Sequence, residues 1–166
     1  MRRLVADSGP LIAFARSRLL ELPHRIAGSL VVPATVYAEC TCEATKPGAA
    51  TLIEARMAGL LEVREDSPAS ARLGILPALG AGEIAVLAMA LELGCPLLMD
   101  ERLGRKIAAL HKIPVVGSAG ILLAAKDRGL MTEIAPVLAV WRAWGYFLSP
   151  QLFDAVLQRA GEHTPG

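Results

Sequence analysis

The chain has 166 residues, the usual size of one compact domain, and 54% of them are apolar, which is ample for a single buried core. A formal net charge of +1 excludes a globally basic surface, so any nucleic acid must be bound through local contacts. Every apolar stretch is interrupted well before the ~20 residues that a membrane span requires, and Asp7 interrupts the N-terminal run too early for a secretory signal. We therefore expect one cytoplasmic domain over residues 1–166, with no membrane partner.

Short apolar runs alternate with helical patterns along the chain. Five runs predict strands, over residues 4–6, 30–32, 60–64, 95–99 and 114–116. Apolar residues at helical spacing predict helices over residues 10–27, 33–45, 49–57, 83–93, 103–111 and 118–127, with further helix toward the C-terminus. Residues 66–81 show no clear pattern. This alternation predicts an α/β fold of three layers, with helices on both faces of an open, mostly parallel sheet.

Acidic residues occupy positions where strand ends and helix starts would meet. Asp7 and Asp100 directly follow the first and fourth predicted strands, Glu83 begins a helix, and Glu39 lies on the helix after the second strand. In open parallel sheets the ligand crevice lies beyond the carboxyl ends of the strands. We therefore expect the four carboxylates to face one crevice.

Carboxylates gathered in one crevice require positive charge. Since like charges raise one another's pKa, a divalent cation is the natural partner, and Mg²⁺ or Mn²⁺ suits oxygen ligands. We expect Asp7 and Asp100 to be the central metal ligands, with Glu39 and Glu83 binding a second metal or orienting its waters. Such a site is suited to phosphodiester hydrolysis by a metal-activated water, without a nucleophilic side chain.

Each of these acids also has an ordinary structural interpretation. Asp7 and Asp100 suit turns and helix caps, and Glu83 at a helix start gains from the helix dipole without any catalytic role. Glu39, with Glu43 one turn later, is equally consistent with a solvated acidic face. The joint pattern, rather than any single residue, favours a site.

Neighbouring residues are candidates for substrate binding. Ser8, at a helix start, could hold a ligand carboxylate or a phosphate oxygen through its hydroxyl or amide. Arg105 shares a helical segment with Arg102 and Lys106, where these cations either contact phosphates or pair with surface acids. Ser118 lies in a glycine-containing turn whose amides could bind phosphate, although the turn lacks the spacing of a P-loop and is as readily a plain tight turn.

Four segments of the chain resemble a bacterial or archaeal PIN-domain protein. They are LVADSGPLIA, VVPATVYAEC, GAGEIAVLAMALELGCPLLMDERLGRKIA and PVVGSAGILLAAKDRGL. More narrowly, the Gly-Glu start of the third acidic helix and the Asp-x-x-x-Gly-Arg segment from Asp100 to Arg105 are similar to one PIN-like subgroup. The resemblance implies a Rossmann-like sheet of order 3-2-1-4-5 and metal-dependent ribonuclease activity on RNA. It also implies frequent dimers and, often, the role of toxin in a toxin–antitoxin pair, with an antitoxin protein as partner.

The resemblance also assigns residues. The family's acidic quartet maps onto Asp7, Glu39, Glu83 and Asp100. Only this match singles out Glu39, and Ser8 takes the place of the usual hydroxyl residue after the first Asp. Leu98 stands where many members carry Thr or Ser, and Glu83 replaces a more frequent Asp. These departures leave an alternative open, a catalytically silent PIN-like module that binds RNA or protein.

Other classes of protein fit the sequence less well. Gly9 stands where an aspartate-based phosphatase would carry the second Asp of an Asp-x-Asp motif, and Ser118 stands where a receiver domain would carry a lysine. The three histidines adjoin no Ser or Cys nucleophile pattern. The three cysteines have no zinc-site spacing, and we interpret them as reduced structural thiols.

The segment over about residues 137–160 is apolar and aromatic and predicts a helical C-terminal extension. Its aromatic cluster consists of Trp141, Trp144, Tyr146 and Phe147. Trp141 and Trp144 would share one helix face with Val137 and Leu138. We interpret this face as the interface of a homodimer or of an antitoxin complex, with ordinary core as the alternative.

Overall fold

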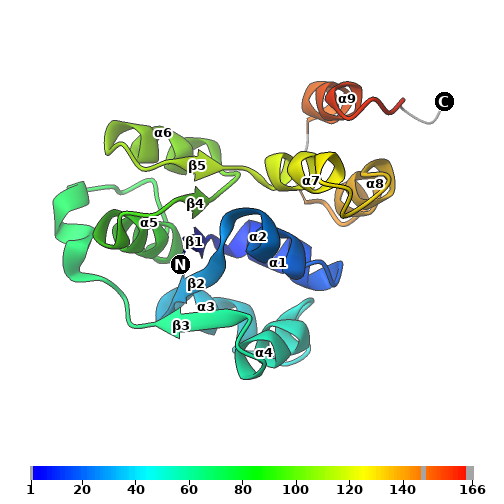
Figure 1. The fold of residues 1–166 in the computed structure, drawn as a ribbon. Coiled ribbons are helices and arrows are strands. Elements are labelled where there is room, and N and C mark those ends of the chain that lie inside the picture. Colours follow the sequence, from blue (N-terminus) through cyan, green and yellow to red (C-terminus); the bar gives the residue numbers. More distant parts are fainter. Residues whose placement is uncertain (1, 147–148, 164–166) are drawn as a thin grey trace. The chain divides into compact units, whose positions relative to one another are not determined.

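The computed structural model describes residues 2–146 and 149–163 and contains a five-stranded sheet in which all neighbouring strands are parallel (Figure 1). The strands are β1 (Arg3–Ala6), β2 (Ser29–Pro33), β3 (Leu61–Arg64), β4 (Leu97–Leu98) and β5 (Val115–Val116). Their order across the sheet is β3-β2-β1-β4-β5. The predicted α/β fold and the strand order implied by the resemblance are therefore confirmed.

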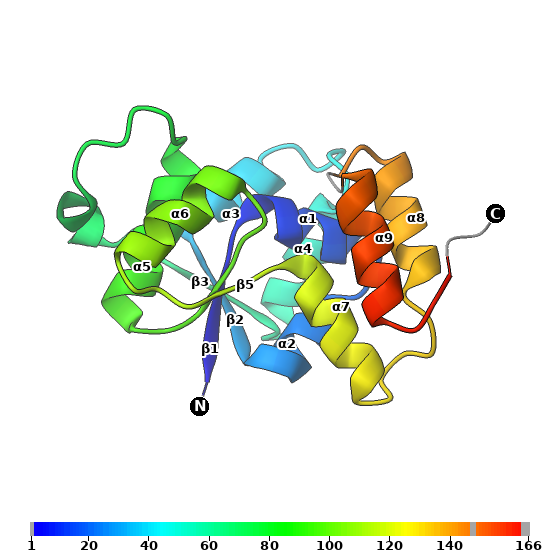
Figure 2. The same cartoon turned by 90° about the horizontal axis from the view of Figure 1, so that it is seen from above.

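Helices cover both faces of this sheet. They are α1 (Ser8–Arg16), α2 (Glu21–Ala27), α3 (Ala34–Thr41), α4 (Ala49–Met57), the 3₁₀ helix η1 (Pro68–Leu73), α5 (Ala81–Leu93) and α6 (Arg102–Leu110). Figures 1 and 2 show α1, α2 and α4 on one face and α5 and α6 on the other. Because both faces are covered, Val5 of β1 and Val31 of β2 are fully buried, and the centres of these two strands are continuous apolar runs.

The apolar pattern over residues 10–27 predicted one helix, and this prediction was wrong. The chain instead forms α1 and α2, separated by a turn in which Arg18 adopts a φ of 57°. A left-handed residue ends the helical hydrogen-bond ladder, although the sequence carries no glycine there. The apolar periodicity continues through the turn because Leu20 and Leu22 still pack into the same core.

The fourth strand is shorter than the run over residues 95–99 predicted. Cys95 N–H donates to the carbonyl of Ala90 at 3.2 Å, so Cys95 belongs to the turn that ends α5. Pro96 follows, and it has no N–H to contribute to a ladder. Only Leu97 and Leu98 therefore pair with both β1 and β5.

The segment over residues 66–81, for which the sequence showed no clear pattern, contains η1. Ser67 caps this 3₁₀ helix by accepting the Ala69 N–H at 3.0 Å.

The chain divides into two compact units, an N-terminal unit of residues 1–118, which holds the sheet, and a C-terminal unit of residues 119–166. The C-terminal unit is built from α7 (Ser118–Asp127), whose first residue closes the N-terminal unit, with α8 (Ala135–Ala143) and α9 (Pro150–Arg159). Within this unit, Glu162 links the end of α9 to α7 and to the start of α8. Its carboxylate accepts hydrogen bonds from Lys126 Nζ at 2.7 Å and from the N–H groups of Ile134 and Ala135 at 2.8 Å each. Within the described residues, no helix is long and apolar enough to cross a bilayer.

The predicted interface face of the C-terminal segment needs correction. Trp141 is 1% exposed and Leu138 is fully buried, so neither side chain offers a surface to a partner. The Trp141 ring also meets the Tyr146 ring edge to face, with 5.5 Å between centroids. Trp144, in contrast, remains half-buried. Phe147 lies outside the described residues.

Candidate active site

Asp7 and Asp100 lie at the carboxyl edge of the sheet, as predicted. Asp7 follows the last residue of β1, and its N–H donates to the carbonyl of Leu98 in β4 at 2.9 Å. Asp100 follows β4 after one further residue, Met99, which is fully buried. The register of β1 against β4 therefore places the two aspartates at adjacent strand ends, where parallel α/β proteins bind ligands.

Asp7 is a buried carboxylate without a counter-charge. It is 5% exposed, and its Oδ1 atom is buried without a hydrogen-bond partner. Asp7 occupies the N-cap position of α1, yet its side chain makes no capping hydrogen bond, so the ordinary capping role does not account for it. A buried polar atom left unsatisfied costs free energy, which points to a partner that this atom is built to receive.

The electrostatic surroundings of Asp7 support this interpretation. Burial raises the pKa of Asp7 to about 6, the hydrogen bond from the Ser8 backbone opposes the rise, and the negative charges of Glu83, Asp100 and Glu101 add to it. Three further carboxylates thus act on Asp7 without a compensating cation among the causes of its shift. This donor set of hard oxygen atoms and uncompensated negative charge fits a divalent cation such as Mg²⁺ or Mn²⁺.

Asp100 is held from the start of α7. Its Oδ1 accepts the Ser118 N–H at 2.8 Å, and its Oδ2 accepts the Ser118 hydroxyl at 2.6 Å. Ser118 is 3% exposed, so the residue expected to contact substrate directs its hydroxyl to Asp100 instead. A Cβ atom on Gly117 would lie 3.0 Å from Asp100 Oδ1 and 3.0 Å from Arg105 Nη1, which places Arg105 beside this carboxylate.

The carboxylates of Glu83, from α5 itself, and of Glu39, from α3, both lie at the start of α5. Glu83 reaches back to accept the Gly80 N–H at 2.8 Å, which is the structural role that a glutamate at this helix position commonly has. Glu39 projects from α3 with its carboxylate against Gly82, where an added Cβ would lie 2.7 Å from Oε2. The positive end of the α5 dipole favours both charges.

The four predicted acids lie in the same part of the sheet edge, but their carboxylates do not converge on one point. In residues 2–146 and 149–163, no three His, Cys, Asp or Glu side chains lie close enough to hold a metal ion. Glu83 is turned to Gly80, Asp100 to Ser118, and Glu39 is exposed. Burial raises the pKa of the Cys40 thiol to about 11, and the charges of Glu39 and Asp7 add to this shift, so both carboxylates lie within electrostatic reach of Cys40.

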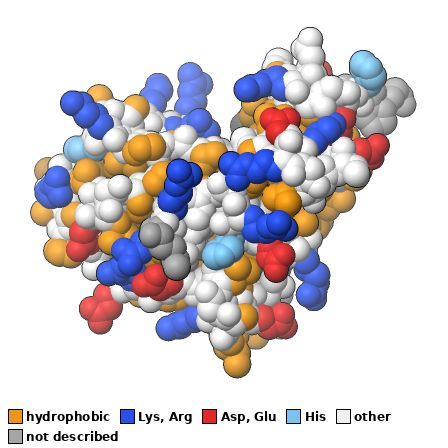
Figure 3. Space-filling model, viewed as in Figure 1, with side chains coloured by type: hydrophobic (Ala, Val, Ile, Leu, Met, Phe, Trp, Pro, Cys, Tyr) orange, Lys and Arg blue, Asp and Glu red, His pale blue; other side chains and the backbone are white. Residues whose placement is uncertain are grey.

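The residues predicted to contact substrate differ in their exposure to solvent. Ser8 is half-buried at the first position of α1, directly after Asp7. Arg102, Arg105 and Lys106 are exposed on α6, and none forms an ion pair within the part of the chain that the structure describes. Figure 3 shows basic side chains gathered over α6. Local positive charge therefore adjoins Asp100 although the whole chain is nearly neutral.

Glu101 belongs to the same electrostatic group, although no role in the site was predicted for it from the sequence. Its charge raises the pKa of Asp7 as part of the acidic surroundings, while its side chain caps α6 by accepting the N–H groups of Leu103, at 3.0 Å, and Gly104. Its position directly after Asp100 was the available signal. Because the cap next to Asp100 is a glutamate, it brings a second negative charge to this edge of the sheet.

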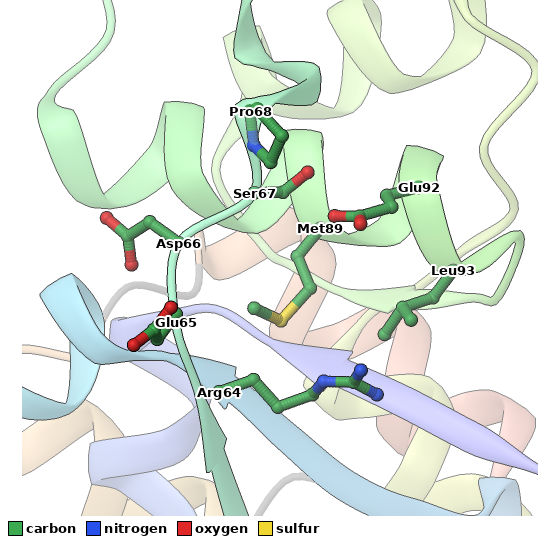
Figure 4. A pocket seen from close by; sticks show the side chains of 8 residues that line it. All are labelled: Arg64, Glu65, Asp66, Ser67, Pro68, Met89, Glu92 and Leu93. Carbon is green, nitrogen blue, oxygen red and sulfur yellow. The ribbon is translucent and has the colours of Figure 1, made fainter.

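A pocket of about 260 Å³ lies elsewhere, beside the edge strand β3. Figure 4 shows the residues that line it, Arg64, Glu65, Asp66, Ser67, Pro68, Met89, Glu92 and Leu93. None of the four predicted carboxylates is among them. Next to it, Asp66 accepts the Thr35 N–H at 3.1 Å and its hydroxyl, and so caps α3 from the loop after β3. This pocket is separate from the acidic group.

The fold and the acidic edge define a Rossmann-like α/β protein with an uncompensated carboxylate site at the switch between β1 and β4. A family model described as PIN domain matches residues 3–162, and the chain belongs to the PIN-domain family. The match extends through both compact units. It gives the protein a nuclease-like fold, in a family that typically uses divalent metals. No curated protein matches the chain.

Proposed function

We propose that this protein is a metal-dependent endoribonuclease that hydrolyses phosphodiester bonds of RNA, with Mg²⁺ or Mn²⁺ as cofactor. The observation that carries the proposal is Asp7, whose buried Oδ1 has no partner and whose pKa is raised to about 6 by burial and by neighbouring negative charge. A folded protein retains such a carboxylate at a stability cost, and in a nuclease-like fold a divalent cation would relieve it.

Each acidic residue has a distinct role in this proposal. Asp7 and Asp100 would hold the metal directly from the ends of β1 and β4, and Glu83 and Glu39 would complete its surroundings from the start of α5. When bound, the cation would polarise the phosphodiester and activate water. Glu83 would first have to exchange its bond with the Gly80 N–H, because that bond turns one of its oxygens toward the helix cap.

Substrate would be bound by groups beside this site. Arg105, which adjoins Asp100 at Gly117, would meet a backbone phosphate together with the exposed Arg102 and Lys106. Ser8, at the first position of α1, would offer its hydroxyl and the helix N-terminus to a phosphate oxygen. Ser118 would contribute indirectly, since its hydroxyl bonds to Asp100.

The biological setting is part of the proposal. Membership of the PIN-domain family supports a cytoplasmic toxin that pairs with an antitoxin protein and forms a homodimer. With Trp141 in the core, the exposed apolar residues of the C-terminal unit available for an interface include Val140 and Leu152, each 44% exposed. Val140, Leu152 and family membership therefore support the homodimer, whereas the buried Trp141 does not.

A second candidate is a catalytically silent module that binds RNA or protein. It is favoured by the present side-chain directions, in which no three described acids, histidines or cysteines form a metal-sized group. Leu98 also lies 1% exposed in β4, so no hydroxyl is available at that position. Metal affinity separates the two candidates, because the silent module requires no cation.

The deciding experiment incubates the purified protein with labelled single-stranded and structured RNAs, and with DNA of the same sequences, in Mn²⁺, Mg²⁺ or EDTA. Asp7→Asn is the test variant, and Asp127→Asn, an exposed aspartate of α7, is the matched control. We expect cleavage of RNA that requires metal, persists in the control and is lost in Asp7→Asn. Equal background in all three proteins, with no Mn²⁺ binding, would establish the silent module instead.

A further inference from the structure

We propose that Ser118 is a positioning residue for Asp100, and that its hydroxyl and the side-chain-free backbone of Gly117 set the direction in which Asp100 faces a divalent cation. The inference rests on the proposed function, because it concerns the same acidic site. It differs from the sequence-based expectation, in which Ser118 contacted substrate.

The register of the sheet brings the two residues together. β4 and β5 pair with Leu97 opposite Val115 and Leu98 opposite Val116. The Met99 N–H donates to the carbonyl of Val116 at 3.1 Å, so the pairing continues past the last residue of β4. Carried two residues further, the same offset of 18 places Asp100 beside Ser118. Parallel pairing, rather than a flexible loop, therefore fixes their proximity.

The hydrogen bonds restrain the carboxylate in two directions. The Ser118 N–H and hydroxyl donate to different oxygens of Asp100, at 2.8 and 2.6 Å. Two donors on two oxygens fix the plane of the carboxylate as well as its position. A carboxylate offers about four acceptor sites, and these bonds use one on each oxygen. Since Ser118 is 3% exposed, water competes little for the hydroxyl.

Gly117 provides the space for this arrangement. A Cβ at this position would lie 3.0 Å from Asp100 Oδ1, closer than ordinary van der Waals contact. It would also lie 3.0 Å from Arg105 Nη1, so a larger residue would press on the carboxylate and on the adjoining cation together. Gly117 thus leaves room for the carboxylate, and the next residue, Ser118, supplies both donors.

Support of this kind has a measurable effect on metal binding. Partners that orient a metal-ligating carboxylate typically change metal affinity by 10–100-fold when removed. Ser118→Ala removes the hydroxyl and retains the N–H, so the bond to Oδ2 of Asp100 is lost while the bond to Oδ1 stays. We therefore expect a loss of Mn²⁺ affinity of about 10-fold, at the lower end of that range.

The experiment measures Mn²⁺ affinity of the full-length, metal-free protein by titration calorimetry, without substrate. Ser118→Ala is compared with Ser118→Thr, which keeps the hydroxyl. Ser67→Ala is the matched control, because Ser67 is 7% exposed in the same unit and its hydroxyl accepts a backbone N–H far from Asp100 in sequence. We expect weaker Mn²⁺ binding in Ser118→Ala, recovery in Ser118→Thr, and wild-type affinity in Ser67→Ala.

A second readout uses no metal. Urea unfolding of the wild type, Ser118→Ala, Asp100→Ala and the double variant forms a double-mutant cycle. If the hydroxyl acts through Asp100, Ser118→Ala lowers the unfolding midpoint in the wild-type background and lowers it less in the Asp100→Ala background. Fully additive effects, or equal Mn²⁺ affinity of Ser118→Ala and the wild type, would overturn the inference alone. Failure of the wild type to bind Mn²⁺ would overturn the proposed function as well.

Discussion

Replacing Asp7 by Asn should remove a pH dependence of stability that this residue imposes on the protein. The pKa of Asp7 is raised from 3.8 to about 6, chiefly by burial, so the gap between the two values is about 2. At 1.36 kcal/mol for each pKa unit, the ionised carboxylate costs the folded protein about 3 kcal/mol at neutral pH. This is a large share of the 5–15 kcal/mol that is typical for a domain.

The direction of the effect follows from proton binding. Below pH 3.8 Asp7 is protonated in both states and costs nothing. Between 3.8 and about 6 the unfolded chain releases the proton while the folded protein keeps it, so the free energy of unfolding falls as pH rises. Above about 6 the residue is ionised in both states and the full cost persists. Asp7→Asn cannot ionise and should lack this fall.

The assay is urea unfolding in EDTA at a series of pH values, followed by far-UV circular dichroism. Fluorescence is unsuitable, because both tryptophans of the chain, Trp141 and Trp144, lie in the C-terminal unit. The amide of Asn carries its own cost in a site without partners, about 1–3 kcal/mol, so the slope against pH is the measure rather than any single value. Parallel stability curves for the wild type and Asp7→Asn between pH 4 and 6.5 would refute the reasoning.

Three further changes test other parts of the structure. Gly82→Ala should leave stability unchanged or raise it by up to ~1 kcal/mol, because alanine favours helices. The added Cβ would lie 2.7 Å from Glu39 Oε2, so it should displace this carboxylate and lower metal-dependent cleavage. Loss of stability without loss of cleavage would contradict this prediction. Glu162→Gln should destabilise the C-terminal unit by about 1.5–3 kcal/mol, the usual contribution of hydrogen bonds to a charged group, as monitored by tryptophan fluorescence. Burial disfavours the ionised form of Glu162, but its bonds with Lys126 and two backbone N–H groups outweigh this and lower its pKa, so acidification should weaken the wild type and spare the variant. Trp141→Phe should lower the stability of the same unit, because Trp141 is buried. The oligomeric state, measured by light scattering, should not change. Dissociation of an oligomer would show instead that Trp141 contributes to an interface.

The sequence by itself determined most of the elements and the edge of the sheet at which Asp7 and Asp100 lie. Short runs of strand length, separated by helical periodicity, predicted all five strands, and the signal is continuous where both faces are buried, as in β1 and β2. Asp7 and Asp100 were found for the same reason, since each ends such a run. The order of the strands came from the resemblance and not from the pattern, because periodicity carries no information on which strands pair.

Side-chain direction and burial were decided only in the tertiary structure. Asp7 and Glu83 both begin helices, yet one is buried without a bond for Oδ1 and the other caps its own helix. Ser118 bonds to Asp100 because parallel strands share a register across 18 residues, which no local pattern contains. Trp141 is buried although its spacing also fitted an exposed helix face, and Arg18 breaks a helix whose apolar spacing continues. Periodicity reports which residues are apolar, whereas the partner of each polar atom depends on what the fold places opposite it.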